Sequence, residues 1–391
     1  MTKRILVFSL VAPPLRVGGA ELAMQEVIDR SIESQGSNFE FDLVTIRFDS
    51  QLPPYERKGK LTIYRVGWGK NQPDIADLWR FPLSGNKYLF PWLAASLAKK
   101  LARERKYDLV WSIMANQAGI AGAWFKKSHP EIPFLLTLQE GDDLDSLAYR
   151  ARLLLPKIFG VFTRANHIQA ISNYLANWAR TKMRATCPVT VIPNGVDVNS
   201  FKLLAVSEEQ KLEKIVITTS RLVYKNGVDV LIKALALLPG DVKLWIVGEG
   251  PEKASLVSLA ESLGLAARVS FLGQVASSVV GQYLAKATIF ARPARSEGLG
   301  NSFLEAMAAG LPVIGTPVGG IPDFLKQHET GWLCEVDNPT SVATQVKFIL
   351  EPENQREVEK IISNAKKLVI ENYDWGKLVV KFNELFYKLT T

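Results

Sequence analysis

Short apolar runs alternate with helix-like patterns along the whole chain. The runs have the length of strands, and the segments between them repeat apolar residues at helical spacing. The predicted strands are Arg4–Ser9, Phe41–Phe48, Leu61–Val66, Leu109–Ile113, Phe134–Leu138, His167–Ser172, Val189–Ile192, Ile215–Ser220, Lys243–Val247, Val269–Leu272, Ala287–Ala291, Val313–Gly315 and Gly331–Glu335. The predicted helices are Ala20–Ser34, Tyr88–Arg105, Ala118–Lys127, Tyr174–Lys182, Gly227–Leu237, Glu252–Leu263, Phe303–Ala309, Thr340–Leu350 and Trp375–Leu389. This alternation predicts βαβ units with parallel sheets, an α/β fold.

The alternation pauses once, near the middle of the chain. The turn-rich sequence Pro193–Asp197 is followed by the polar stretch Ser207–Lys214, so we place a domain boundary after residue 198. Residues 1–198 and 199–374 are each long enough for a doubly wound, Rossmann-like domain. Open sheets of this kind bind ligands at the carboxyl ends of their strands, which predicts a ligand site in a cleft between two facing domains.

The composition is that of an ordinary globular protein. The 391 residues are 47% apolar and 22% charged, and no apolar run reaches the ~18 residues of a membrane-spanning helix. The apolar start of the chain stops at Pro13-Pro14 without a small-residue cleavage site, so we interpret it as a core strand and not as a signal sequence. Two cysteines and three histidines leave little material for disulfides or a histidine-ligated metal, which favours a reducing, cytoplasmic location.

The excess positive charge lies in the first half of the chain. Residues 1–198 hold 26 Lys and Arg against 18 Asp and Glu, whereas residues 199–391 hold 21 of each kind. This excess indicates either an anionic partner, such as a phosphate-rich acceptor or an anionic membrane, or only a solvated basic face. The segments Arg150–Arg164 and Trp79–Trp92 mix apolar and basic residues as a membrane-facing surface does, but buried segments share this pattern. No recognition motif accompanies the charge, so we expect no nucleic-acid binding.

Two strand–loop–helix junctions carry candidate phosphate-binding loops. Gly18 and Gly19 follow the first strand, where glycine lets the backbone approach a ligand and helix amides attract an anion. A tight turn would explain the same pair. Arg221 and Lys225 follow a later strand, in a loop that enters a helix at Gly227. Two cations placed there can neutralise a diphosphate, although a solvated basic loop has the same pattern.

The third and densest loop, residues 295–305, precedes another predicted helix. Its two glycines leave amides exposed ahead of the helix N-terminus, where an anion can bind. Glu297 stands in the loop, where no local structure needs a carboxylate. Glu305 either contacts a ligand or completes a capping box with Ser302, and the sequence pattern leaves both interpretations open.

Two further motifs give weaker indications. Val247-Gly248-Glu249-Gly250-Pro251 follows a strand but lacks the third glycine of a dinucleotide-binding fingerprint, because Lys253 stands in its place. Asp143-Leu144-Asp145 has the side chains to chelate a divalent ion together with a substrate diphosphate. Such a triplet is also frequent in solvated loops.

In their combined order these segments resemble the retaining glycosyltransferases of family four, enzymes of the GT-B fold. The likeness covers most of the chain and is strongest from about Val189 to Leu333. It is carried by VIPNGVD at 191–197, SRLVYKNGVDVLIKA from Ser220, VGEGP from Val247 and SEGLGNSFLEAMAAGLPVIGTPVGGIPD from Ser296. The resemblance implies transfer of a sugar from a nucleotide-diphosphate donor to a hydroxyl of a glycan, a polysaccharide or a lipid-linked precursor. It also implies that a final helix over 375–391 returns to the first domain.

The resemblance implies roles for individual residues. Glu297 would contact the donor sugar and Glu305 the ribose, while the cations Arg221 and Lys225 would neutralise the diphosphate. Backbone groups that hold the sugar and phosphates would be those of Gly298, Leu299, Gly300, Asn301 and Ser302, with Gly18 and Gly19 closing on the phosphates. The implied reaction is a front-face substitution with Glu297, Arg221 and Lys225 as catalytic residues. It needs no cofactor or metal, because fixed cations and amides stabilise the leaving group.

The sequence departs from the family pattern at two positions. Asn226 replaces the Lys that often precedes the loop glycine, and Lys225 lies one residue earlier. The His that many members carry in the first domain is absent, which leaves Gln139, Glu140 and Asp142 as acceptor-side candidates.

Two other functions are compatible with the sequence. One is a nucleotide-sugar epimerase or hydrolase of the same fold, which would need acid–base groups, and the scarcity of histidine counts against it. The other is a non-catalytic nucleotide-binding protein on the same scaffold, which the two departures favour and the presence of both Glu297 and Glu305 disfavours. The sequence does not specify the donor base, the sugar, the linkage or the oligomeric state.

Overall fold

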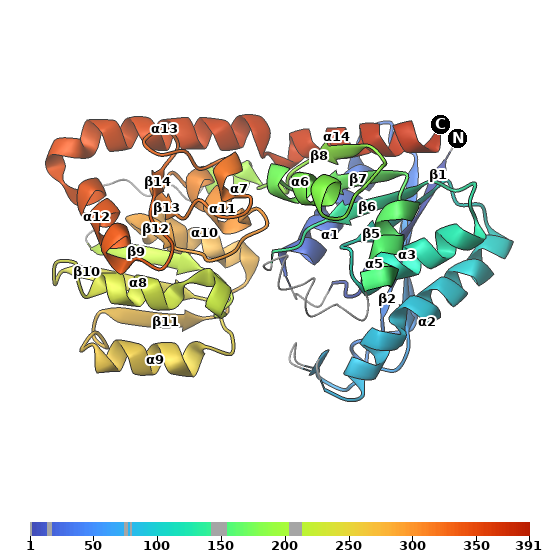
Figure 1. Cartoon of the computed structure of the whole chain (residues 1–391), viewed down its shortest axis with the longest axis horizontal. Helices are drawn as coiled ribbons and strands as arrows, with labels where there is room; N and C mark the ends of the chain where they lie inside the picture. Colours follow the sequence, from blue (N-terminus) through green and yellow to red (C-terminus); the bar gives the residue numbers. More distant parts are fainter. Residues whose placement is uncertain (1, 14–17, 74–76, 79, 142–154, 203–212) are drawn as a thin grey trace. The chain divides into compact units, whose positions relative to one another are not determined.

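The computed structural model describes residues 2–13, 18–73, 77–78, 80–141, 155–202 and 213–391. The chain divides into two compact units, each with its own β-sheet (Figure 1). The first unit comprises Met1–Glu140, Leu144–Pro193 and Gly376–Thr391, and the second comprises Gly141–Asp143 and Asn194–Trp375. The main division falls at Pro193, shortly before the boundary that we expected at residue 198.

The first unit is built on an eight-stranded sheet in the order β3-β4-β2-β1-β5-β6-β7-β8. Its strands are β1 (Lys3–Phe8), β2 (Phe39–Ile46), β3 (Tyr55–Lys58), β4 (Leu61–Val66), β5 (Leu109–Ile113), β6 (Phe134–Leu138), β7 (His167–Ala170) and β8 (Val189–Val191). Its helices are α1 (Gly19–Glu33), α2 (Leu83–Glu104), α3 (Gln117–Ser128), α5 (Leu155–Arg164), α6 (Asn173–Thr181) and α14 (Trp375–Thr390). Strand β3 pairs antiparallel with β4, whereas the other pairs are parallel.

Helix α14 completes the core of the first unit. Phe386 packs edge-on against Phe39 of β2 and Trp111 of β5, with ring centroids 5.6 and 5.2 Å apart. Lys3 Nζ of β1 donates a hydrogen bond to the Thr390 carbonyl at 2.6 Å, which ties the last turn of α14 to the start of the chain. The last helix of the sequence therefore buries the apolar surface of strands that form near its beginning.

The second unit contains a six-stranded parallel sheet in the order β11-β10-β9-β12-β13-β14. Its strands are β9 (Lys214–Thr219), β10 (Val242–Val247), β11 (Val269–Gly273), β12 (Ile289–Arg292), β13 (Val313–Gly315) and β14 (Trp332–Leu333). Its helices are α7 (Val198–Lys202), α8 (Val228–Leu235), α9 (Lys253–Ser262), α10 (Ser277–Lys286), α11 (Asn301–Ala308), α12 (Pro339–Leu350) and α13 (Gln355–Asn372), with short 3-10 turns η3 (Tyr224–Asn226), η4 (Ile321–Asp323) and η5 (Pro352–Asn354).

Each sheet reverses its strand order at one place. In the second unit β9 has β10 on one side and β12 on the other, and in the first unit β1 lies between β2 and β5. Loops that leave the carboxyl ends of such neighbouring strands diverge, which opens space for a ligand. The two reversals therefore mark where each unit is expected to carry its functional loops.

Candidate functional site

Lys225 and Glu297 both lie close to Gly141, in loops at the carboxyl edge of the sheet in the second unit. Lys225 follows β9 and Glu297 follows β12, which are neighbouring parallel strands. Lys225 Nζ donates a hydrogen bond of 2.7 Å to the carbonyl of Gly141, a residue that clusters with this unit. A Cβ placed on Gly141 would lie 3.0 Å from Lys225 Nζ and 3.6 Å from Glu297 Oε1. An ammonium and a carboxylate therefore lie within reach of the same small chemical group.

The loop that carries Arg221 and Lys225 is shaped by the residue that departs from the family pattern. Asn226 is buried, and its Nδ2 donates to the Arg221 carbonyl at 2.6 Å. The next residue, Gly227, has a φ of +66°, and a Cβ there would lie 2.0 Å from the Pro293 carbonyl oxygen. Asn226 and Gly227 therefore fix the loop from inside, while the Arg221 side chain stays exposed.

Arg295 joins this loop to the loop after β12, a role that the sequence analysis did not assign. Its Nη1 and Nη2 donate to the two Asp229 carboxylate oxygens at 2.8 and 2.9 Å, and Nη1 also donates to the Tyr224 carbonyl at 2.6 Å. The guanidinium also stacks over the Tyr224 ring at 3.9 Å. Although burial raises the pKa of Asp229, the hydrogen bonds from Arg295 hold that pKa below its usual value.

Arg292 orients Glu297 and is a second residue that the sequence analysis missed. The buried guanidinium donates to Glu297 Oε2 at 2.5 Å and to Ser302 Oγ at 2.8 Å, and it lies 4.5 Å over the Phe303 ring. The other carboxylate oxygen, Glu297 Oε1, accepts from the Gly298 amide at 2.9 Å. Protein donors thus hold both oxygens of Glu297. The signal in the sequence was a charged residue that closes an otherwise apolar strand.

Glu305 does not form the capping box that was one of its two interpretations. Helix α11 begins at Asn301, two residues earlier than predicted, with Gly300 as its N-cap and no side-chain cap hydrogen bond. Ser302 Oγ accepts from Arg292 instead. Burial raises the pKa of Glu305 to about 7, and Arg292 lowers it in part. Glu305 is therefore a half-buried carboxyl group whose pKa is raised toward neutral pH.

The start of α11 has the geometry of an anion site. Gly298, Leu299 and Gly300 are buried, and Gly300 adopts a φ of +102°. Because no side chain caps the helix there, amides of its first turn are available to a ligand. Asn301 Oδ1 accepts a hydrogen bond of 3.5 Å from Asn194 Nδ2, which links this turn to the VIPNGVD segment.

Glycines beneath the two loops allow close backbone packing. A Cβ on Gly319 would lie 1.7 Å from the Glu297 carbonyl oxygen, and a Cβ on Gly248 would lie 1.9 Å from the Ser220 carbonyl oxygen. A Cβ on Gly250 would meet the Leu222 carbonyl oxygen at 2.3 Å. The VGEGP and PVGG segments therefore support the loops after β9 and β12.

In the first unit, the predicted glycine pair follows β1, where the strand order reverses, and the acceptor-side candidates follow β6, two strands away. Gly18 is the N-cap of α1 with an extended φ of −171°, Gly19 is the first helical residue, and both are exposed. Glu140 follows β6 and is buried; its Oε1 accepts from the Ala115 amide at 2.7 Å, which fixes the loop after β5. Gln139 is half-buried beside it. Asp142, the Asp143–Asp145 triplet, Trp79 and the start of Arg150–Arg164 lie outside the described residues.

Among the residues that the structure describes, no group of three or more His, Cys, Asp or Glu side chains is arranged to hold a metal ion. Within the same residues, no helix combines the length and the apolarity that crossing a bilayer requires. Cys187 and Cys334 are both free thiols.

Two family descriptions match adjoining parts of the chain. Glycosyltransferase Family 4 matches residues 17–200, and Glycosyl transferases group 1 matches residues 200–368. The two matches meet at residue 200, seven residues after the main division of the chain at Pro193, and follow one another without a gap. The chain belongs to the group 1, family 4 glycosyltransferases, and it is an enzyme of that class.

Named relatives share the class but differ in what they act on. The chain is 28% identical over 304 residues to N-acetyl-alpha-D-glucosaminyl L-malate synthase of Bacillus anthracis, covering 75% of this chain and 78% of that relative. It is 32% identical over 218 residues to the GDP-mannose-dependent alpha-(1-6)-phosphatidylinositol monomannoside mannosyltransferase of Mycobacterium tuberculosis, covering 50% of this chain and 57% of that relative.

Solved structures define the fold. Sucrose-phosphate synthase from Thermosynechococcus elongatus matches 100% of this chain and 99% of its own with a TM-score of 0.82 at 20% identity. Anabaena HepE, solved in complex with UDP, matches 99% of this chain and 100% of its own with a TM-score of 0.74 at 20% identity. The predicted GT-B fold, an α/β fold with two parallel-sheet domains, is confirmed.

Proposed function

We propose that this glycosyltransferase moves a sugar from a nucleotide-diphosphate sugar to an acceptor hydroxyl, with retention at the anomeric carbon and without a metal ion. The observation that carries the proposal is that Lys225 and Glu297 both lie close to Gly141, with Glu297 in the loop that leads into α11. A diphosphate needs fixed positive charge and backbone amides, and sugar hydroxyls need a carboxylate that accepts hydrogen bonds. The loops that leave the neighbouring strands β9 and β12 carry groups of both kinds, which supports the proposal.

The reaction we propose is a front-face substitution. The bond between the anomeric carbon and the diphosphate oxygen breaks while a bond to the acceptor oxygen forms on the same face of the sugar. The acceptor proton passes to the departing phosphate oxygen. Arg221, Lys225 and the first amides of α11 stabilise the negative charge of the leaving group, which lowers the barrier without a titrating base.

The carboxylates position the donor in this proposal. Glu297, oriented by Arg292 and by the Gly298 amide, accepts hydrogen bonds from the sugar hydroxyls. Glu305 contacts the ribose as a carboxyl that can donate or accept a hydrogen bond near neutral pH. In the first unit, the amides of Gly18 and Gly19 are assigned to the phosphates, and Gln139 and Glu140 to the acceptor.

The acceptor we propose is a hydroxyl of a glycan or of a lipid-linked molecule. Malate appears in the name of one relative and phosphatidylinositol monomannoside in that of another. The basic first half of the chain is consistent with an anionic acceptor and with peripheral contact to an anionic membrane. We place the enzyme in the cytoplasm, where its two free thiols would stay reduced.

A thermal-shift screen across nucleotide sugars and free nucleotides tests the proposal. A ligand at ~100 times its dissociation constant stabilises the folded protein by about 2.7 kcal/mol. With the donor so identified, Glu297→Gln should abolish most transfer while the nucleotide still stabilises the protein, and the exposed Glu353→Gln variant should behave as the unmodified enzyme. Stabilisation by a nicotinamide dinucleotide alone would overturn the proposal. A new sugar nucleotide formed without acceptor would indicate an epimerase, and free sugar as the sole product would indicate a hydrolase.

A further inference from the structure

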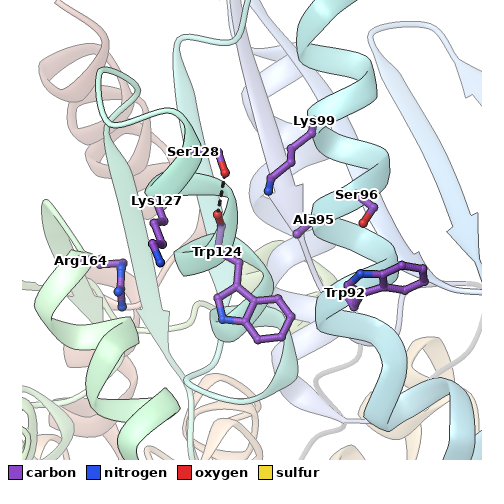
Figure 2. Close-up of a pocket in the computed structure, with 8 residues that line it drawn as sticks. All are labelled: Trp92, Ala95, Ser96, Lys99, Trp124, Lys127, Ser128 and Arg164. Carbon is purple, nitrogen blue, oxygen red and sulfur yellow. Dashed lines mark hydrogen bonds between the residues drawn. The ribbon is translucent and has the colours of Figure 1, made fainter.

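A groove of about 540 Å³ lies on the helical surface of the first unit, between α2 and α3 (Figure 2). Its lining residues are Trp92, Ala95, Ser96 and Lys99 of α2, Trp124, Lys127 and Ser128 of α3, and Arg164 of α5. Ser128 and Arg164 are the last residues of their helices. Helices that connect parallel strands run antiparallel to them, so these ends lie toward the amino edge of the sheet. The groove is therefore separate from Gly18 and Glu140, which lie at the carboxyl edge.

The groove is basic. Lys99, Lys127 and Arg164 contribute three cations, and its lining includes no carboxylate among the residues that the structure describes. All three side chains are exposed, and in Figure 2 Lys99 extends from α2 into the space beside α3. Cations gathered in this way without an acidic partner in the same lining attract a phosphate group.

An aromatic row runs along α2 into the same groove. Tyr88, Trp92, Ser96 and Lys99 follow one another at intervals of four, four and three residues, so they share one face of the helix. Tyr88 is 67% exposed and Trp92 is 62% exposed. Just before the helix, Phe81 is 83% exposed. Exposed aromatic rings followed by a cation on one helix face are typical of a surface that rests at a membrane–water interface.

We propose that this groove binds the phosphate of an anionic phospholipid headgroup at a membrane surface. Lys99, Lys127 and Arg164 surround the phosphate, while the rings of Trp92 and Tyr88 enter the interfacial region of the bilayer. A free phosphate or a soluble sugar phosphate carries the same charge, but it would leave the aromatic row in water. This inference rests on the membrane contact included in the proposed function, and it is independent of the transfer reaction.

Sedimentation of the full chain with vesicles tests the groove. We expect binding to vesicles of phosphatidylcholine mixed with phosphatidylglycerol and little binding to phosphatidylcholine alone. Each basic residue near an anionic surface contributes about fivefold to partition, so K99Q/K127Q should lower the partition coefficient roughly 30-fold. Trp92→Ala should weaken binding as well. The matched control, K286Q/K360Q, removes two exposed lysines of the second unit and should bind as the unmodified protein does.

Two results would overturn this proposal in different ways. Equal loss of vesicle binding in K99Q/K127Q and K286Q/K360Q would contradict a binding role for the groove, because it would show that only the total charge of the protein matters. In the second result, inorganic phosphate protects the Trp92 ring from quenching of its fluorescence while the protein fails to sediment with anionic vesicles. That result would identify a soluble phosphate as the ligand and would contradict the proposal of a phospholipid. Loss of donor stabilisation in the thermal-shift screen would instead contradict the proposed function and leave the vesicle result standing.

Discussion

The guanidinium of Arg292 lies 2.5 Å from Glu297, so the carboxylate at the centre of the candidate site depends on a buried cation at the end of β12. Removing one partner of a buried ion pair leaves the other charge without compensation and costs about 3–5 kcal/mol. Arg292→Met should lower the free energy of unfolding by about 3 kcal/mol in a urea titration. The exposed Arg356→Met variant serves as the control and should change it little. Equal stability of the two variants would show that Glu297 does not need its partner.

Lys225 should affect turnover more than stability. In Lys225→Met the leaving diphosphate loses one fixed cation, which raises the barrier by on the order of 3 kcal/mol and lowers kcat about 100-fold. Steady-state kinetics with the donor found in the screen measures this change, and Lys225→Arg should recover part of it because the charge returns. Lys286→Met, which removes an exposed lysine elsewhere in the unit, should leave kcat unchanged. A Lys225→Met enzyme with normal kcat would exclude the residue from leaving-group stabilisation.

Glu305 should make stability fall as the pH rises. Its folded-state pKa of about 7 lies above the ordinary value of 4.5, so the folded protein holds the proton more tightly than the unfolded chain does. The cost of ionising this half-buried carboxyl is absent below about pH 4.5, grows between pH 4.5 and 7, and reaches at most about 3 kcal/mol above that range. Urea titrations of the unmodified protein and of Glu305→Gln across this window should diverge, with the unmodified protein losing more stability. Parallel curves would contradict the raised pKa.

Gly227 should resist substitution. Its positive φ and the Pro293 carbonyl oxygen, 2.0 Å from the position of a Cβ, both exclude a side chain. Gly227→Ala should cost at least about 2 kcal/mol, of which the left-handed backbone accounts for about 1–2 kcal/mol. Gly240→Ala is the matched control, since nothing lies within 4 Å of a Cβ there. Thermal unfolding compares the two variants, and a similar Tm for both would show that the loop can move away from Pro293.

Elements with a continuous apolar run could be predicted from the sequence, and elements without one could not. Strands β5 and β9 are buried along nearly their whole length, and so are the last four residues of β1, so these strands stand out as apolar runs. Strand β3 is a polar, largely exposed edge strand. It is held in an extended conformation by its pairing with β4, and no apolar run in the sequence indicates it. Helix α13 was also missed, because a polar exterior surrounds its narrow buried stripe of Val358, Ile361, Ala365 and Val369.

In the candidate site, too, the positions of residues along the chain could be predicted from the sequence, whereas contacts between residues far apart in the chain could not. The positions of Lys225 and Glu297 in loops that follow strands could be predicted from the sequence, whereas the pairing of those two strands, β9 and β12, could not. The partnership of Arg292 with Glu297 and Ser302 depends on tertiary packing, and so does the approach of Gly141 to Lys225. The two interpretations of Glu305 could be separated only by the observed start of α11 at Asn301 and by the Arg292 hydrogen bond to Ser302.

The placement of α14 in the first unit has a consequence for how the protein is made. Because the second unit occupies Asn194–Trp375, a ribosome finishes that unit before it releases the segment that seals the first. Until Phe386 is synthesised, the aromatic faces of Phe39 and Trp111 lack their cover. The core of the first unit therefore cannot be completed until synthesis has passed Phe386, and a nascent chain stalled before residue 376 would leave apolar surface of this sheet exposed to aggregation.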